Sequence, residues 1–271
     1  MTISNNFQAI SALTLGAFFA ALIRTGRLLK EEKIVIFGEM EKSQKISELI
    51  SSLLQRQGLP QNETLQHIRL LKKEDFFETD FLKLLKDFHA STLIGISGGK
   101  NVFSENILKQ MGQNSPSPII FPLSTPLKEA EATAEDIYKA TNGRAMICTG
   151  ALFPPLAIKS TDMDENRPTT RDVLFSTLDP ALIQPAISSA LKVAKLKDAS
   201  KKMLIAAAVM IAQKSPRNIS KEKGILPDKK HFEEISGSIA LAMAEEAVKE
   251  KRCPPLSQEA LKIALEKEFH A

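Results

Sequence analysis

The sequence TLIGI, at residues 92–96, is the third of five short apolar runs in the first half of the chain. Stretches with apolar residues at helical spacing separate these runs, for example from Phe103 to Met111. Strands that alternate with helices are typical of a parallel sheet covered by helices on both faces. The sequence therefore predicts a doubly wound α/β fold with a mainly parallel sheet, its strands at residues 34–37, 68–71, 92–96, 118–121 and 145–148.

The second half of the chain has a different character. A polar segment from Lys159 to Arg171 predicts an exposed loop or insertion. Beyond it we expect three helices, at residues 181–194, 200–213 and about 230–251, with Ser200 as an N-cap. After Cys253, Pro254 and Pro255, a short amphipathic helix over residues 258–269 can pack on the body or on a partner. We therefore expect one domain over residues 1–252 and a short helical tail over 253–271.

Composition limits the function classes. The chain has 271 residues, is 43% hydrophobic and 25% charged, and carries a formal net charge of +4. These values are ordinary for a soluble globular protein, and the dispersed lysines and arginines argue against nucleic acid as a partner. Its two cysteines, Cys148 and Cys253, are too few for a disulfide framework. The composition predicts a cytoplasmic protein.

An apolar run from Phe7 to Ile23 imitates a signal peptide or membrane anchor. No Lys or Arg precedes it, Ser11 and Thr14 interrupt it, and it is shorter than the roughly 20 apolar residues of a spanning helix. We therefore interpret it as a buried helix and expect no membrane partner. A cleaved leader is the less favoured alternative, because the nearest positive charges follow the run instead of preceding it.

Three motifs carry a family resemblance. Residues 119–126 read IIFPLSTP, residues 128–135 read KEAEATAE, and residues 143–145 read GRA. They closely resemble, in the same order, a segment of the malic enzymes. The resemblance spans roughly residues 4–250 and lacks the family's N-terminal domain, which carries a catalytic tyrosine and lysine and two metal-binding carboxylates. It implies a Rossmann-like domain that binds NAD or NADP and takes part in the oxidative decarboxylation of malate to pyruvate with a divalent metal.

The positions that the resemblance assigns to chemistry are altered. The aspartate pair that helps to hold the metal falls on Asn5 and Asn6, and the asparagine of the family's S-N-P falls on Thr125. Amides carry no charge, whereas Mg²⁺ and Mn²⁺ prefer anionic oxygen ligands. The family's G-Q-G-N-N run falls on residues 176–180, where both amides are absent. The four histidines are scattered and lack metal-ligand spacing. The sequence therefore argues against a bound metal and against catalysis.

The dinucleotide fingerprint that the resemblance places at residues 38–43 is also degraded. Gly38 keeps the tight turn and Ser43 is small enough for the helix to approach the strand. Met40 stands where a side chain would block the pyrophosphate, and Glu39 adds negative charge beside it.

Two further places bear on the cofactor. Lys72 matches the acidic residue expected at the second strand end, and with Lys73 it could attract a 2′-phosphate or be a plain solvated lysine. The GGK run at 98–100 lacks the spacing of a phosphate loop and predicts a βα turn. In the malic enzymes, which this sequence resembles, the loop at this place approaches the cofactor, so the resemblance implies that Ser97 and Gly98 would touch a bound nucleotide.

Two functional hypotheses follow. The first is a malic enzyme-like NAD(P)-binding pseudoenzyme, oxidoreductase-like in fold, that acts as a nucleotide-binding or protein-interaction scaffold. The alternative is the functional half of a split NAD(P)-dependent malic enzyme. The candidate partners are a second copy of this chain, as a homodimer, or a separate N-terminal malic enzyme chain. Binding of NAD or NADP stays open in both.

Overall fold

A parallel sheet forms the centre of the computed structural model, which describes residues 3–159, 170–217 and 224–269. Within these residues the sheet has six strands in the order β2-β1-β3-β4-β5-β8, and all neighbouring pairs are parallel. The Rossmann-like prediction is confirmed, and the five predicted strands lie within one or two residues of their expected bounds. The strands are β1 (Ile34–Gly38), β2 (Ile68–Lys72), β3 (Thr92–Ile96), β4 (Ile119–Pro122), β5 (Met146–Thr149) and β8 (Ser176–Thr177).

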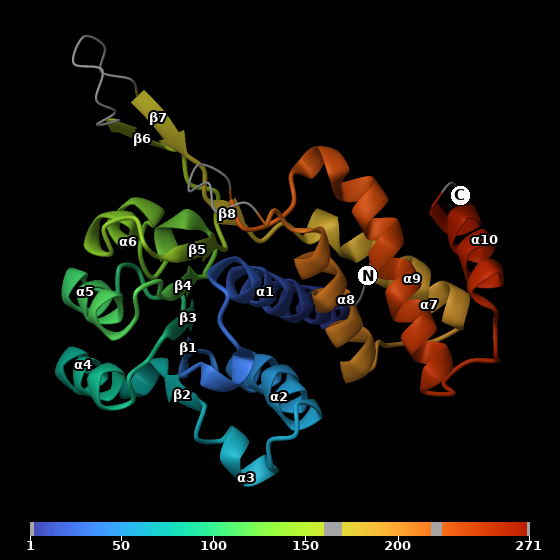
Figure 1. Cartoon of the computed structure of the whole chain (residues 1–271), viewed down its shortest axis with the longest axis horizontal. Helices are drawn as coiled ribbons and strands as arrows, with labels where there is room; N and C mark the ends of the chain where they lie inside the picture. The colour runs from blue at the N-terminus through green and yellow to red at the C-terminus, as the bar shows by residue number, and fades with distance from the viewer. Residues whose placement is uncertain (1–2, 160–169, 218–223, 270–271) are drawn as a thin grey trace.

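Alternate residues of the strands enter two separate hydrophobic cores. Ile34 and Ile36 of β1 face α1 (Ile3–Thr25) and α2 (Met40–Arg56). Val35 and Phe37 face the opposite layer. Side chains of successive strand residues point to opposite faces, so buried runs without polar residues require helices on both sides. The second layer consists of α4 (Glu78–Asp87), α5 (Glu105–Asn114) and α6 (Ala134–Ala140), as Figure 1 shows.

A layer of helices follows the sheet in sequence and packs beside α1 (Figure 1). Ser200 caps α8 as predicted, because its Oγ accepts a hydrogen bond from the N–H of Met203 at 3.1 Å. In the last helix Leu261 and Leu265 are buried in the same core, so this helix packs on the body. The division at residue 252 stays a prediction. The helices are α7 (Gln184–Ala194), α8 (Lys201–Lys214), α9 (Phe232–Lys249) and α10 (Gln258–Phe269).

Helix α1 is the buried helix predicted from the apolar N-terminal run. A Cβ on Gly16 would lie 2.9 Å from Ile211 of α8, so the two helices approach closely at this glycine. By length and composition, residues 7–25 could cross a membrane, but 67% of the stretch is buried inside the protein. Core helices pass the same test, so its composition reflects packing here.

One part of the topology was not predicted. The segment from Lys159 to Arg171 was expected to be an exposed loop or insertion, and its ends belong to an antiparallel hairpin, β6 (Leu156–Lys159) with β7 (Thr170–Val173). The hairpin projects from the sheet (Figure 1). Each strand has only four residues, too few for a clear alternating pattern. Residues 160–169 lie outside the described part of the chain.

Short connecting elements complete the description. They are α3 (Gln61–Thr64) and the 3-10 turns η1 (Leu29–Glu31), η2 (Lys73–Asp75), η3 (Leu127–Glu129), η4 (Pro180–Leu182) and η5 (Lys229–His231).

Candidate functional site

The candidate site lies at the carboxyl edge of the sheet, where β1 and β3 are neighbours and the chain leaves them in opposite directions. In open α/β sheets, ligands bind outside the carboxyl ends of the strands at such a switch point. The register pairs Gly38 with Ile96 and with Lys72, so the ends of β2, β1 and β3 are level. The predicted cofactor residues of the first three strands therefore meet at one edge.

Gly38 forms the tight turn predicted for it. Its φ is +140°, and a Cβ there would lie 2.4 Å from the carbonyl of Ile96 and 2.6 Å from the nitrogen of Ser97. Only glycine tolerates both the conformation and this approach. The N–H of Glu39 donates to the Ile96 oxygen at 3.2 Å. Ser43 is buried, and its Oγ donates to the Glu39 oxygen at 2.9 Å, which lets α2 lie against the strand.

The acidic residues in the first turn of α2 were expected to repel a phosphate, but both are paired with lysines. The Glu39 carboxylate makes no cap hydrogen bond and instead pairs with Lys42 at 2.8 Å. Glu41 pairs with Lys45 at 2.9 Å, and the hydrogen bond from that ammonium lowers the pKa of Glu41. Each acid is thus matched by a lysine, and the predicted repulsion of a phosphate is weaker than the sequence suggested. Met40 is the first residue of the helix, and the steric objection to a diphosphate stays a prediction.

The two lysines after β2 lie beside this turn. Lys72 is the register partner of Gly38 and is exposed, and Lys73 begins η2 and is exposed as well. The structure therefore brings Lys72 to the same edge as the glycine turn. Both ammonium groups are open to solvent, which fits either of the two interpretations given for them.

The turn after β3 holds Ser97 and Gly98 in different surroundings. Ser97 is buried, and its Oγ donates to Glu131 Oε1 at 2.9 Å and accepts from the N–H of Gly99 at 3.1 Å. Its hydroxyl is thus engaged within the protein. Gly98 is half-buried, with φ +63°, and its N–H donates to Ser124 Oγ at 2.8 Å. Of the two residues, Gly98 is the more exposed. The GGK run is a βα turn, as predicted.

Sequence reasoning missed Glu131. This side chain is fully buried and accepts hydrogen bonds from Ser97 and Ser124, the residues that follow β3 and β4. It stands between two alanines inside the KEAEATAE motif. The motif also holds Glu129 and Glu135, so nothing in it singles out Glu131, and its partners come from segments that the sequence does not place side by side.

The remaining predicted positions lie farther along the edge or outside it. Thr125 follows Ser124, is exposed, and precedes Pro126 through a cis peptide bond. A groove of about 570 Å³ lies next to it, with Leu127, Lys128 and Phe153 in its wall. Asn5 and Asn6 fall in the first turns of α1, and their side chains lie outside the described part of the chain.

Residues 176–180, matched above to the family's G-Q-G-N-N run, have structural roles. Ser176 and Thr177 form β8, and Ser176 Oγ accepts from the N–H of Leu226 at 2.9 Å. Asp179 caps η4 through the N–H of Ala181 at 3.0 Å.

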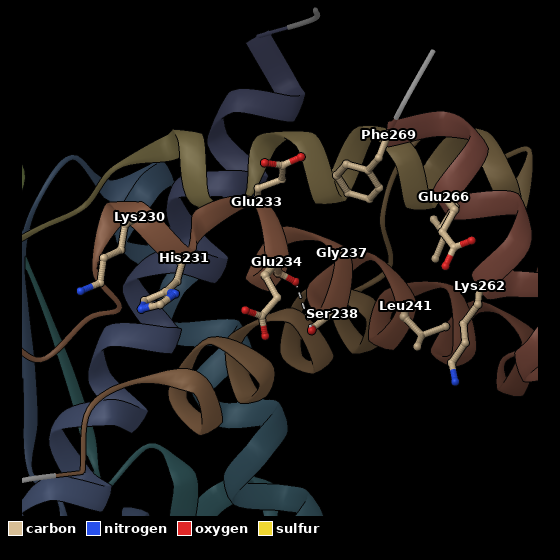
Figure 2. Close-up of a pocket in the computed structure, with 11 residues that line it drawn as sticks. Lys230, His231, Glu233, Glu234, Gly237, Ser238, Leu241, Lys262, Glu266 and Phe269 are labelled. Carbon is tan, nitrogen blue, oxygen red and sulfur yellow. Dashed lines mark hydrogen bonds between the residues drawn. The ribbon is translucent and has the colours of Figure 1, made fainter.

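A second hollow of about 580 Å³ lies between α9 and α10, away from the sheet edge (Figure 1). Figure 2 shows its ionisable side chains spread along η5, α9 and α10: Lys230, His231, Glu233, Glu234, Lys262 and Glu266. They do not converge on one point, so this hollow offers no constellation for chemistry.

Comparison with known proteins identifies the fold and the family. A sequence model described as "Malic enzyme, NAD binding domain" matches residues 69–248. The chain belongs to the malic enzyme family. An NAD-dependent malic enzyme of Escherichia coli (strain K12) is 28% identical over 98% of this chain and 50% of its own length. The chain spans about half the length of the curated relatives it matches.

Two solved malic enzymes share this fold. The enzyme from Entamoeba histolytica superposes with a TM-score of 0.69 at 16% identity, covering 98% of this chain and 53% of the other. The enzyme from Pyrococcus horikoshii Ot3 gives 0.70 at 18% identity, covering 98% and 59%. At such identities the likeness shows the fold alone.

The malic enzyme cofactor fits this edge in part. Gly38 would let a dinucleotide approach the backbone, and the small side chain of Ser43 lets α2 lie close to β1, whereas the side chain of Met40 would stand where the diphosphate is expected. For a divalent metal, the described residues contain no cluster of three or more His, Cys, Asp or Glu side chains. The resemblance places the neutral amides of Asn5 and Asn6 where the family has metal-binding acids, and the expectation that this chain holds no divalent metal stays a prediction.

Proposed function

We propose that this chain is a malic enzyme-like NAD(P)-binding domain that has lost catalysis and acts as a nucleotide-binding or protein-interaction scaffold. One observation carries the proposal. The backbone frame of the switch point is intact at Gly38, while the positions assigned to chemistry hold Asn5, Asn6 and Thr125. A fold can persist after its site is lost, because core packing and site chemistry depend on different residues.

Catalysis and dinucleotide binding depend on different residues, so catalysis can be lost while binding is retained. Oxidative decarboxylation requires a metal to polarise the malate oxygens and a group that can take up a proton. Asn5 and Asn6 supply neither charge nor a titratable group. Dinucleotide binding depends instead on the glycine turn and the helix that follows. Met40 weakens that binding sterically without removing the turn.

A protein partner is the second half of the proposal. Leu127 and Leu152 at the carboxyl edge are 50% and 74% exposed, and apolar surface of this kind fits burial in an interface. The occupant is either a second copy, giving a homodimer, or a separate N-terminal malic enzyme chain. Both cysteines are free thiols, which suits a cytoplasmic location.

A split malic enzyme is the competing function. The observation that favours it is length: the curated relatives carry about as much chain again as this one covers. In that case a separate N-terminal chain would bring its own metal-binding acids, and this chain would supply the cofactor-binding site.

Calorimetric titration of the purified chain with NADH and with NADPH, followed by a malate-dependent reduction assay with Mg²⁺ or Mn²⁺, tests the proposal. We expect dinucleotide binding weaker than the micromolar range and no reduction. The assay is repeated with the N-terminal half of a relative added. Malate-dependent reduction in either arm would overturn the scaffold proposal and support the split enzyme. The matched variant Asn5→Asp with Asn6→Asp, run in the same assay, reports whether the two amides are the cause of inactivity.

A further inference from the structure

We propose that Glu131 is a positioning residue that locks the turn after β3 to the turn after β4, making one fixed wall of the candidate nucleotide site. The expected effect on ligand affinity rests on the dinucleotide binding proposed above. The expected effect on the two turns rests on the hydrogen bonds alone. The first turn consists of residues 97–99, and the second begins at Ser124.

The contacts join segments that lie far apart in the sequence. Glu131 Oε1 accepts from the backbone N–H of Ser97 at 2.6 Å, from Ser97 Oγ at 2.9 Å, and from Ser124 Oγ. Glu131 Oε2 accepts from the backbone N–H of Ser124 at 3.2 Å. Ser124 Oγ in turn accepts from the N–H of Gly98 at 2.8 Å. Ser97 Oγ likewise accepts from the N–H of Gly99 at 3.1 Å. One carboxylate thus fixes four backbone N–H groups of two turns, two directly and two through hydroxyls.

Burial makes this arrangement demanding. Glu131 is 0% exposed, and all four of its donors are uncharged. A carboxylate removed from water must have its oxygens satisfied by hydrogen bonds, and donors left without an acceptor are penalised as well. Any rearrangement of either turn would leave buried polar groups unpaired. The turns are therefore held in one conformation before a ligand arrives.

The surrounding chain makes room for the carboxylate. A Cβ on Gly95 of β3 would lie 2.7 Å from Glu131 Cγ and 2.7 Å from Phe103 Cζ. The backbone of Glu131 is also bound, because its carbonyl accepts from the N–H of Phe103 at 2.9 Å. The side chain enters the carboxyl edge through a gap that a glycine provides.

The lock reaches the glycine turn of the fingerprint. The nitrogen of Ser97, which donates to Glu131, is also the atom that a Cβ on Gly38 would meet at 2.6 Å. Moving Ser97 would change the space beside Gly38, where diphosphate would lie. Glu131 acts on the ligand through Ser97 and Gly98 without touching it.

The test compares Glu131→Gln with Glu135→Gln. Glutamine keeps the shape of Glu131 but turns one acceptor into a donor that faces another donor. Glu135 lies in the same motif, is exposed, and makes only a surface ion pair with Lys139 at 2.6 Å, so its variant is the matched control. Three quantities are measured: thermal unfolding, amide hydrogen exchange by residue, and NADH affinity by titration of the folded protein.

For Glu131→Gln we expect exchange at Ser97, Gly98 and Ser124 to become at least about tenfold faster, and NADH affinity to fall about tenfold, since a hydrogen bond to a charged group is lost. Exchange in α7, α8 and α9 stays unchanged, and Glu135→Gln behaves as the parent does.

Two results would overturn the proposal. One is unchanged exchange in the two turns. The other is exchange that rises equally in the sheet and in the helices, with NADH affinity preserved, which marks a merely structural role. If the parent chain binds no NADH, the proposed binding fails, and the exchange pattern still decides whether Glu131 positions the turns.

Discussion

The sheet holds one buried glutamate at each of its two edges, and the two are stabilised in different ways. At the amino edge, Glu32 is paired with Arg27 at 3.3 Å and accepts from Ser91 Oγ at 2.7 Å and Thr92 Oγ1 at 2.8 Å. At the carboxyl edge, Glu131 accepts only from uncharged donors, two of them backbone N–H groups.

The two glutamates have different structural roles: Glu32 holds two segments together, whereas Glu131 fixes the conformation of two turns. The Arg27–Glu32 pair joins the segment after α1 to the starts of β1 and β3, and its side chains could adjust without moving the backbone. Glu131 binds backbone N–H groups directly, so its position specifies the path of the turns. A lock of the second kind suits an edge where a ligand would meet the main chain. The two glutamates therefore predict unequal consequences when either is removed.

The largest effect is expected from Glu131→Ala. It leaves four buried donors without an acceptor, and we expect a loss of about 4 kcal/mol in the free energy of unfolding. Glu32→Ala should cost less, about 3 kcal/mol, because Arg27 keeps its hydrogen bonds to Thr25 Oγ1 and Ser115 Oγ. Denaturant titration of both variants measures the order. Equal losses, or a larger loss for Glu32→Ala, would contradict the distinction drawn between the two edges.

Arg27→Met removes the cationic partner of Glu32 at the amino edge. It leaves the Glu32 carboxylate buried with two hydroxyl donors only, and we expect destabilisation of about 2 to 3 kcal/mol. Burial lowers the pKa of Arg27, and the Glu32 charge raises it in part. Arg56→Met, at the exposed end of α2, is the control and should change stability by less than about 0.5 kcal/mol. A neutral result for Arg27→Met would mean that Glu32 is held by its hydroxyl partners alone.

Met40→Gly restores bare backbone beside the glycine turn. If the methionine side chain is what hinders diphosphate, NADH affinity should rise about tenfold, equivalent to roughly 1.4 kcal/mol. Met40→Ala is the matched variant, since it shortens the side chain without the flexibility of glycine, and an intermediate gain is expected. Calorimetry measures both. Unchanged NADH affinity in the glycine variant would mean that the Met40 side chain does not hinder binding.

Asp179→Asn should have the smallest effect, because its charged partner, Lys229, is 75% exposed and an ion pair at the surface contributes little. Partial burial alone would raise the pKa of Asp179, but hydrogen bonds from Lys229 and from the N–H of Ala181 outweigh it and lower the pKa. A lowered folded pKa contributes stability above the unfolded value, and that stability is lost as pH falls through the folded one. We expect a deficit of at most about 1 kcal/mol at neutral pH that disappears well below pH of about 4. A deficit that persists in acid would show that the charge is not its source.

The strands could be predicted because buried parallel strands leave unbroken apolar runs in the sequence. The same reasoning failed for Ser176 and Thr177, because a two-residue strand has no run to recognise, and for the β6–β7 hairpin. The N-cap at Ser200 could be predicted, since capping is local to one turn of chain.

The candidate site was predictable only where its contacts are local or its backbone is constrained. Gly38 and Ser43 occupy the predicted turn. The pairing of Glu39 with Lys42 spans three residues and could have been expected from helical spacing. Glu131 could not, because its partners Ser97 and Ser124 meet it only after β3 and β4 are placed side by side.

Helix α1 joins two halves of the architecture that are separate in sequence. Its side chains share one continuous core with β1, β3 and β4 on one side and with α7, α8 and α9 on the other, and α10 extends that core through Leu261. Within the described residues, this core is therefore shared between the sheet and the helices. Heating should therefore melt the sheet and the helices together in a single cooperative transition, and a fragment lacking residues 3–25 should have no stable fold to melt.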